Sequence, residues 1–395
     1  MARGASEPAA RLLISVVGAR PNFMKVAPIV RALRDCGHIA HQVVHTGQHY
    51  DPSMSADFFR DLDLPRPLCN LEVGSGSHAQ QTALVMQRLE PVLRETRPAM
   101  VLVYGDVNST LAAALVAAKL GIPVAHVEAG LRSRDRAMPE EINSVLTDRL
   151  ADSLLAPSRD AVENLLREGT EPERIYFVGN VMIDTLVSGL ESARARNLPQ
   201  RYGVEPEGYG VVTLHRPGNV DDPARLTQLC RALIELGRDL PLLFPVHPRT
   251  RARLPDAAWT GHGARVRALD PLSYLDMLGL IASAALVITD SGGLQEETTY
   301  LGTPCLTIRP TTERPITCTE GTNRLVAPTP RAILDAARSA RRTGRRPASI
   351  EGWDGRAAQR IAAVLTASGA RGSPRDLVTA CPAPRGEALL PTERP

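Results

Sequence analysis

Two acidic side chains in the first half of the chain follow closely after short apolar runs. Asp106 comes two residues after the run Met100–Tyr104, and Glu128 comes directly after Val124–Val127. Short apolar runs of this kind are typical of buried strands. Because open α/β sheets bind ligands at the carboxyl ends of parallel strands, we expect both carboxylates at such a site. Carboxylates gathered there can take protons from carbon or oxygen and return them.

Other polar side chains of this half stand near predicted strand-to-helix turns. Arg20 and Lys25 flank the turn after the run Leu12–Val17, where both could reach an anion; a solvated helix start is the alternative. Glu140 and Glu141 follow a proline and open a further predicted helix, where acidic residues are favoured. One of these two glutamates is expected to do no more than cap that helix.

The stretch Thr289–Glu297 joins an apolar strand to a predicted helix and carries the turn residues Ser291, Gly292 and Gly293. Free backbone N–H groups and the positive end of a helix make such a turn an anion site. Glycine lets the backbone approach a phosphate closely. One turn later, Glu296 or Glu297 could accept hydrogen bonds from ribose hydroxyls. An ordinary glycine-rich turn is the alternative interpretation.

Two histidines occupy corresponding places in the second half of the chain. His215 ends the predicted strand Gly210–His215, and His247 ends the predicted strand Leu242–His247. Their matching positions favour a site over core packing. A different pair, His41 and His45, has the spacing of zinc ligands. Valines between them favour a strand that lacks a third ligand, so no metal site is predicted.

Strand, turn and helix alternate through most of the sequence and then repeat in the same order. This pattern predicts an α/β protein with two Rossmann-like, doubly wound domains that face each other across a cleft. We place the first domain at residues 11–186, completed by a helix at 353–367, and the second at 187–352. Residues 368–395 are rich in Pro, Gly, Ala and Arg, and we expect them to be disordered.

Composition excludes several classes of protein. The 395 residues carry a net charge of +3 and only 4% aromatic side chains, so a nucleic-acid partner is not expected. No apolar run approaches membrane length, and the first is too short for a signal peptide. Six scattered cysteines without a C-x-x-C pair indicate the reducing cytoplasm. Neither G-x-G-x-x-G after the first strand nor a Walker loop is present, so a nucleotide-bearing substrate is favoured over NAD or ATP hydrolysis.

Several of these motifs, in this order, resemble the UDP-N-acetylglucosamine 2-epimerase family, non-hydrolysing bacterial type. They are Gly18-Ala-Arg-Pro-Asn-Phe-Met-Lys25, Gly105-Asp106, His126-Val-Glu-Ala-Gly-Leu-Arg132, Pro139-Glu-Glu-Ile-Asn143, Gly179-Asn180, Pro245-Val-His247, the Thr289–Glu297 stretch and Thr312-Glu-Arg-Pro315. The resemblance runs from about Leu12 to Leu365. It implies a GT-B type fold, a homodimer, and interconversion of UDP-GlcNAc and UDP-ManNAc without metal or nicotinamide cofactors.

The resemblance also implies roles for the candidate residues. Asp106, Glu128 and Glu140 would form the acid–base group, with the division of labour open. His215 and Arg20 would stabilise the departing diphosphate. Ser291, Gly292, Gly293 and Glu297 would hold phosphate and ribose, with Lys25 and His247 as further binding residues.

Two departures from the family pattern bear on specificity. Ser144 stands where many members have arginine after Pro-Glu-Glu-x-Asn, which bears on the choice of sugar. His215-Arg-Pro-Gly-Asn219 replaces His-Arg-Arg-Glu-Asn. That motif, with Gln48 and His49, resembles the region that binds an activating second substrate in some relatives.

The alternatives to a non-hydrolysing epimerase are a hydrolysing relative that releases ManNAc and UDP, a retaining GT-B glycosyltransferase, and a silent nucleotide-sugar binder.

Overall fold

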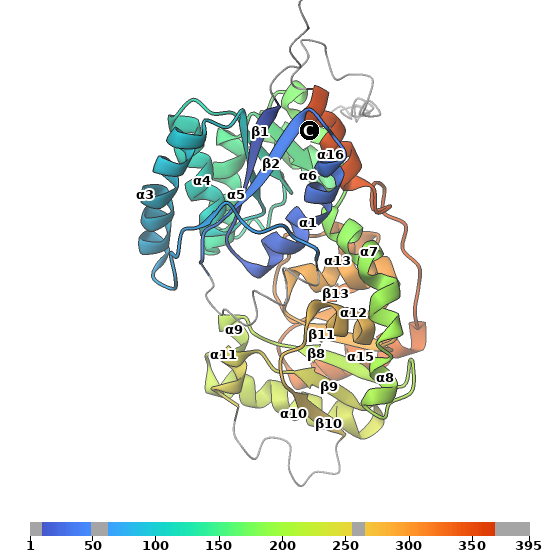
Figure 1. Ribbon diagram of the computed structural model, residues 1–395. Helices are drawn as coiled ribbons and strands as arrows, with labels where there is room; N and C mark the ends of the chain where they lie inside the picture. Colours follow the sequence, from blue (N-terminus) through green and yellow to red (C-terminus); the bar gives the residue numbers. More distant parts are fainter. Residues whose placement is uncertain (1–9, 49–61, 255–264, 368–395) are drawn as a thin grey trace, which may run out of the picture.

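The computed structural model describes residues 10–48, 62–254 and 265–367, and two parallel sheets organise them. Figure 1 shows one sheet in the upper half of the molecule and the other in the lower half. The strands of the first sheet are β1 (Arg11–Val17), β2 (Ile39–His45), β3 (Cys69–Asn70), β4 (Met100–Tyr104), β5 (Val124–Val127), β6 (Ser153–Ala156) and β7 (Ile175–Phe177). Those of the second are β8 (Gly210–Thr213), β9 (Leu242–Pro245), β10 (Val266–Leu269), β11 (Leu286–Thr289), β12 (Cys305–Thr307) and β13 (Asn323–Leu325).

Helices follow most strands, as the predicted alternation requires. The longer ones are α1 (Arg20–Arg34), α3 (His78–Thr96), α4 (Asn108–Lys119), α5 (Pro139–Leu150), α6 (Arg159–Arg167), α7 (Val181–Ala195), α10 (Pro223–Asp239), α12 (Tyr274–Ala282), α13 (Gly292–Leu301), α15 (Pro330–Thr343) and α16 (Ala357–Ala367). Short turns of helix are η1 (Pro172–Arg174), α8 (Leu198–Arg201), α9 (Pro217–Val220), α11 (Pro248–Arg251) and α14 (Ile316–Thr319). No helix of the described ranges is both long and apolar enough to cross a membrane.

Both sheets have the strand order of doubly wound folds. The first reads β3-β2-β1-β4-β5-β6-β7 and the second β10-β9-β8-β11-β12-β13. In each sheet the chain reverses its direction of winding beside the first strand, between β1 and β4 and between β8 and β11. Ligands bind at these switch points in open α/β sheets. The loops that leave these four strands carry Asp106, His215 and the turn at Ser291. The sequence predicted these positions for Asp106 and Ser291, but it placed His215 at the end of a strand that stops at Thr213.

Strand β4 shows why the apolar runs become central strands. All five of its residues are buried, because helices cover both faces of a parallel sheet. Leu102 and Tyr104 pack into the core on one face, while Val101 and Val103 pack into the core on the other. Strands buried on both faces are continuous apolar runs, so this element was predictable from sequence.

The last described helix packs against the first domain. Helix α16 packs against α1 and α7, and in Figure 1 its red ribbon lies beside the blue α1. The Asp184 carboxylate of α7 accepts from the backbone N–H groups of Ala357 and Ala358, at 3.0 and 2.7 Å. This contact stabilises the first turn of α16, as side-chain acceptors do at helix starts.

Some predicted bounds were wrong. The last helix begins at Ala357, because Trp353 lies in the preceding loop, where its indole N–H donates to the carbonyl oxygen of Pro157. The proposed boundary at 186/187 falls inside α7, which continues to Ala195. The stretch 191–209, whose Pro, Gly and charged residues predict a connector, contains α8. The exact domain boundaries stay a prediction. The amphipathic pattern of Asp51–Leu64 predicts a helix, but only its last three positions belong to the described residues. The tail 368–395 lies outside them.

Candidate active site

Glu128 is a buried carboxylate held by two cations. Its Oε2 accepts from the Lys25 ammonium of α1, and its Oε1 lies 2.8 Å from Nη2 of Arg314. Burial raises the pKa of Glu128, but the charges of Lys25 and Arg314 outweigh burial and leave this pKa lowered. Its φ of 74° is unusual for a residue other than glycine, and such strain concentrates at functional sites. Glu128 is therefore an ionised carboxylate in a constrained turn.

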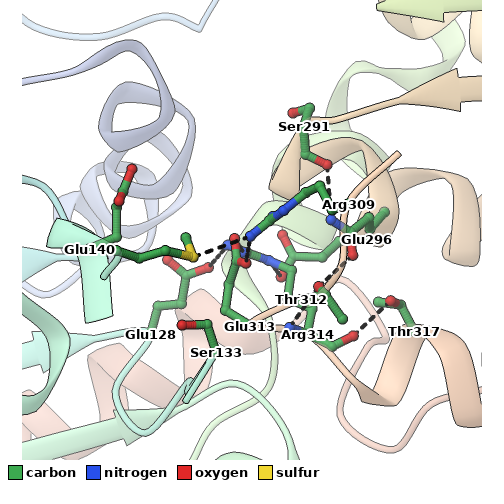
Figure 2. Close-up of polar contacts among 12 residues, drawn as sticks. Glu128, Ser133, Glu140, Ser291, Glu296, Arg309, Thr312, Glu313, Arg314 and Thr317 are labelled. Carbon is green, nitrogen blue, oxygen red and sulfur yellow. Dashed lines mark hydrogen bonds and ion pairs between the residues drawn. The ribbon is translucent and has the colours of Figure 1, made fainter. Parts of the chain in front are cut away.

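Arg314 is the centre of a buried ion cluster that joins the two sheets. It lies in the loop between β12 and α14 of the second sheet and contacts Glu128 of the first, as Figure 2 shows. Its Nε lies 2.9 Å from Glu296, and its Nη1 lies 2.7 Å from Glu313. We refer to these four residues as the Arg314 cluster. Arg314 was not predicted as a site residue from the sequence, although its Thr-Glu-Arg-Pro motif was the available signal.

Asp106 is a half-buried carboxyl at the end of β4. Among the described residues, its side chain makes no hydrogen bond or ion pair, while its backbone oxygen accepts from Asn143 Nδ2 at 2.9 Å. Burial raises the pKa of Asp106, the charges of Lys25 and Arg314 lower it, and the net shift is upward. Asp106 and Glu128 are thus near enough to share cations, yet their pKa values are shifted in opposite directions.

Helix α5 separates the roles of its two first-turn glutamates. Glu141 accepts from the backbone N–H and the hydroxyl of Ser133, at 2.6 and 2.8 Å, and so fixes the preceding loop. The Glu140 carboxylate is more exposed and lies 3.3 Å from the guanidinium of Arg216, which comes from the second sheet. Figure 2 shows Glu140 at the edge of the Arg314 cluster. Glu140 is accordingly the one of this pair that can meet a ligand.

Asp290 orients His215 at the switch point of the second sheet. The carboxylate of Asp290 is fully buried and lies 2.9 Å from His215 Nδ1. It also accepts from the backbone N–H groups of His215 and Arg216 and from Asn219 Nδ2. Burial by itself would raise the pKa of Asp290, but these donors lower it by more. The net shift is downward, so the carboxyl is ionised. Asp290 was not predicted as a site residue from the sequence, because its partners are distant in the chain.

His247 is adjacent to His215, with ring centroids 5.5 Å apart. It is exposed and precedes α11, where its Nδ1 accepts from the backbone N–H of Arg249 at 3.1 Å. The neutral ring therefore carries its proton on Nε2. His215 and His247 can together donate to an anion at this edge of the sheet.

The turn at Ser291 has the geometry predicted for an anion site. Helix α13 begins at Gly292, and the Ser291 side chain makes no capping hydrogen bond to it. A Cβ atom on Gly292 would lie 2.7 Å from Arg314 Nη1 and 2.8 Å from Glu313 Oε1, whereas Gly293 is less crowded. The amino end of α13 thus lies directly against the Arg314 cluster, and the helix and the guanidinium both favour a bound anion.

The structure distinguishes the two glutamates of α13. Glu296 Oε1 accepts from Asn180 and pairs with Arg314, so this carboxylate is already engaged. Glu297 is 3% exposed, and burial raises its pKa to about 8. The Tyr274 hydroxyl beside it lowers that pKa but makes no hydrogen bond of normal geometry among the described residues.

The pKa of Glu297 predicts a loss of stability as pH rises. A carboxyl with a raised pKa binds its proton more tightly in the folded protein, so unfolding releases that proton between the unfolded value of 4.5 and about 8. Its contribution to stability is complete below this window and is lost through it. We expect Glu297→Gln to reduce the difference between the unfolding free energies measured in urea at pH 5 and pH 8. An identical difference in both proteins would contradict the assigned pKa.

The remaining candidates divide into those that the structure joins and those that it leaves apart. Lys25, Glu128, Arg314, Glu313, Arg216 and Glu140 form a continuous series of ion pairs, with the Arg216–Glu313 step longest at 3.9 Å. Arg20 begins α1, but its side chain is outside the described structure. Ser144 is buried in α5, and nothing in the structure explains its presence there.

Comparison with known proteins adds independent information. Residues 31–366 match the family model described as UDP-N-acetylglucosamine 2-epimerase. The UDP-N-acetylglucosamine 2-epimerase of Methanocaldococcus jannaschii is 40% identical over 362 residues, 89% of this chain and 98% of the relative. The UDP-2,3-diacetamido-2,3-dideoxy-D-glucuronate 2-epimerase of Pseudomonas aeruginosa is 42% identical over 330 residues, 83% of this chain and 91% of the relative.

Solved structures agree with these matches. The crystal structure of the M. jannaschii enzyme in complex with UDP-GlcNAc and UDP has a TM-score of 0.81 at 40% identity, covering 90% of this chain and 99% of that one. A UDP-glucosyltransferase from Polygonum tinctorium has a TM-score of 0.57 at 14% identity, covering 92% of this chain and 100% of that one, which shows a shared fold alone. The predicted GT-B type architecture with two Rossmann-like domains is therefore confirmed.

Proposed function

Since this chain belongs to the UDP-N-acetylglucosamine 2-epimerase family, we propose that it is a non-hydrolysing epimerase that interconverts UDP-GlcNAc and UDP-ManNAc. The hydrogen on C2 of the sugar is not acidic, because C2 has no neighbouring carbonyl group. In the proposed route UDP leaves C1, and the positive charge that develops there makes the C2 proton removable. The products of this elimination are UDP and a 2-acetamidoglucal. A proton then returns to the opposite face of C2, and UDP adds again at C1.

The observation that carries the proposal is that Arg314 lies between the carboxylates and the amino end of α13. Loss of UDP from C1 and loss of a proton from C2 occur at adjacent carbons, so the diphosphate site must adjoin the carboxylates. Arg314 contacts Glu128, and it also lies against Gly292 at the amino end of α13. A guanidinium and a helix end stabilise charge that develops on a leaving phosphate. This adjacency supports elimination.

The opposite pKa shifts of Asp106 and Glu128 support a division of roles. Carboxyl pairs whose environments push their pKa values apart commonly separate into proton carrier and charged group. Asp106, which has a raised pKa and an unengaged side chain, is proposed as one proton carrier. Glu140 is proposed as a second, and Glu128 is proposed to stabilise the developing positive charge when Arg314 turns from it to the diphosphate. His215, with Arg20, is proposed to bind the departing diphosphate.

The nucleotide is proposed to bind along the edge of the second sheet. Ser291, Gly292 and Gly293 would receive phosphate, and Glu297 would accept a ribose hydroxyl. Lys25 and His247 complete the proposed set. The route needs neither metal nor nicotinamide, since proton transfers and loss of a diphosphate suffice.

The decisive experiment is epimerisation in heavy water. If a carboxyl removes the C2 proton and a different acid returns one, the new C2 hydrogen derives from solvent. UDP-GlcNAc should therefore gain deuterium at C2 as it becomes UDP-ManNAc, which mass spectrometry and proton NMR can follow. Traces of UDP and glycal should appear on long incubation, because the intermediate escapes when the site opens.

The other enzyme classes give different results in the same assay. A hydrolysing relative would also label C2 but would accumulate free ManNAc and UDP. A glycosyltransferase would leave C2 unlabelled and would require an acceptor. Epimerisation with full retention of the original C2 hydrogen would eliminate the proposed mechanism while leaving the substrate in place.

A second candidate substrate is a UDP-diacetamido-glucuronate, for which the relative at 42% identity is named. The same elimination applies, because both sugars carry an acetamido group on C2. Running the assay with both substrates decides between them through kcat/KM.

We also propose that the enzyme is a homodimer in the cytoplasm. The resemblance implies the dimer, which sedimentation can test. The five cysteines of the described ranges are free thiols, which supports a reducing compartment.

A further inference from the structure

His126 and Asp148 form a buried pair behind the carboxylates of the site. His126 lies on β5, two residues before Glu128, and Asp148 lies on α5. His126 Nδ1 lies 2.6 Å from Asp148 Oδ1, and His126 Nε2 lies 2.8 Å from the carbonyl oxygen of Gly105. His126 is completely buried, so these are the contacts that determine its protonation.

The contacts require a proton on both ring nitrogens of His126. A carbonyl oxygen can only accept, so Nε2 donates to Gly105. Asp148 is ionised, since the buried Arg132 guanidinium lies beside it and its Oδ2 accepts from the backbone N–H of Gly130. Nδ1 must therefore donate to Asp148 as well. The charges balance, because Arg132 lies 2.7 Å from Asp148 and 2.8 Å from Glu168.

Each member of the pair holds a different turn of the site. The ring of His126 binds the carbonyl of Gly105, which precedes Asp106. Asp148 Oδ2 accepts from the backbone N–H of Gly130 at 3.1 Å, in the turn that begins with Glu128. Neighbouring carbonyls are held similarly: Asn22 and Thr110 donate to Tyr104, and Asn143 donates to Asp106. The backbone N–H of Gly105 also donates to the carbonyl oxygen of Val127 at 3.0 Å, so the pair adds side-chain contacts to a backbone link between the two segments.

We propose that Asp148 and a doubly protonated His126 are a positioning pair, which fixes the Asp106 turn and the Glu128 turn in one geometry for proton transfer at the sugar. The inference rests on the proposed function. Removal of a proton from one face of C2 and its return to the other need groups held accurately relative to the sugar. A displacement of about 1 Å can cost on the order of a hundredfold in rate.

The first test is the ring protonation of His126. Full-length protein labelled with ¹⁵N-histidine should show one ring with two protonated nitrogens at neutral pH, and its signals should disappear in His126→Gln. In Asp148→Asn the amide N–H can donate to Nδ1, so the ring should lose one proton while its hydrogen bond to Gly105 persists. A singly protonated His126 ring in the wild-type protein would overturn the proposal.

The second test is kinetic and uses a matched control. Asp148→Asn should lower kcat about tenfold, and His126→Gln by roughly a hundredfold, with little change in KM because the nucleotide site is on the other sheet. Both variants should release more glycal per epimerisation, since mispositioned acids return the proton late. Glu168→Gln disturbs the same charges at their half-buried outer end and should retain wild-type kcat.

The outcomes separate the possibilities. If Asp148→Asn loses thermal stability but keeps the wild-type kcat and glycal ratio, or if Glu168→Gln loses as much turnover as Asp148→Asn, the pair is merely structural and the proposal fails. If the wild-type enzyme does not epimerise at all, the proposed function fails, and the histidine spectrum alone decides the protonation of His126.

Discussion

Replacing Asp106 by Asn or Glu140 by Gln should lower turnover by about a hundredfold or more, the range expected for a lost general acid or base. Glu128→Gln should have a comparable effect, because it removes the negative charge that Lys25 and Arg314 hold in place. Asparagine and glutamine keep the size of each side chain but neither take nor return a proton at the sugar. Substrate affinity should change much less than turnover, since the nucleotide is proposed to bind on the other sheet. Steady-state kinetics on the epimerisation reaction gives both quantities.

Glu141→Gln is the matched control for Glu140→Gln. Both residues are glutamates in the first turn of α5, but Glu141 is committed to the Ser133 loop. Its replacement should reduce stability while affecting turnover far less than the change at Glu140. Wild-type turnover in all three site variants would remove the acid–base assignment, and equal losses at Glu140 and Glu141 would assign Glu140 a structural role.

Arg314→Gln should produce the largest loss of stability among single changes in the site. It leaves Glu128, Glu296 and Glu313 buried without their shared cation, and breaking a buried ion pair from one side costs about 3–5 kcal/mol. Urea unfolding measures this loss directly. Turnover should also fall, because the variant lacks a cation for the departing diphosphate.

Two further variants test the origin of the lost stability. The double variant Arg314→Gln, Glu296→Gln should recover part of the stability, because Glu296 has no other ion pair among the described residues and its charge is removed with that of its partner. Arg94→Gln breaks an exposed pair with Glu90 and should have a small effect. If Arg314→Gln and the wild-type protein unfold with the same urea midpoint, the three carboxylates are not held as described.

The central strands were predictable because burial on both faces demands uninterrupted apolar runs. Met100–Tyr104 and Val124–Val127 have the same bounds in the sequence prediction and in the structure. The start of α16 was not predictable in this way. The contact of Trp353 with Pro157, remote in sequence, keeps Trp353 out of the helix, and local composition carries no trace of that contact.

Sequence alone determined which groups could do chemistry in this protein, since acids after apolar runs and glycines before a helix are local patterns. It also determined the family, because the motifs keep their order along the chain. Tertiary structure decided how these groups are charged. Glu128 meets Arg314 across 186 positions of chain, and His126 meets Asp148 across 22. A pKa depends on burial and on neighbouring charges, both of which arise only when the sheets assemble, so the opposite shifts at Asp106 and Glu128 could be derived only from the folded chain.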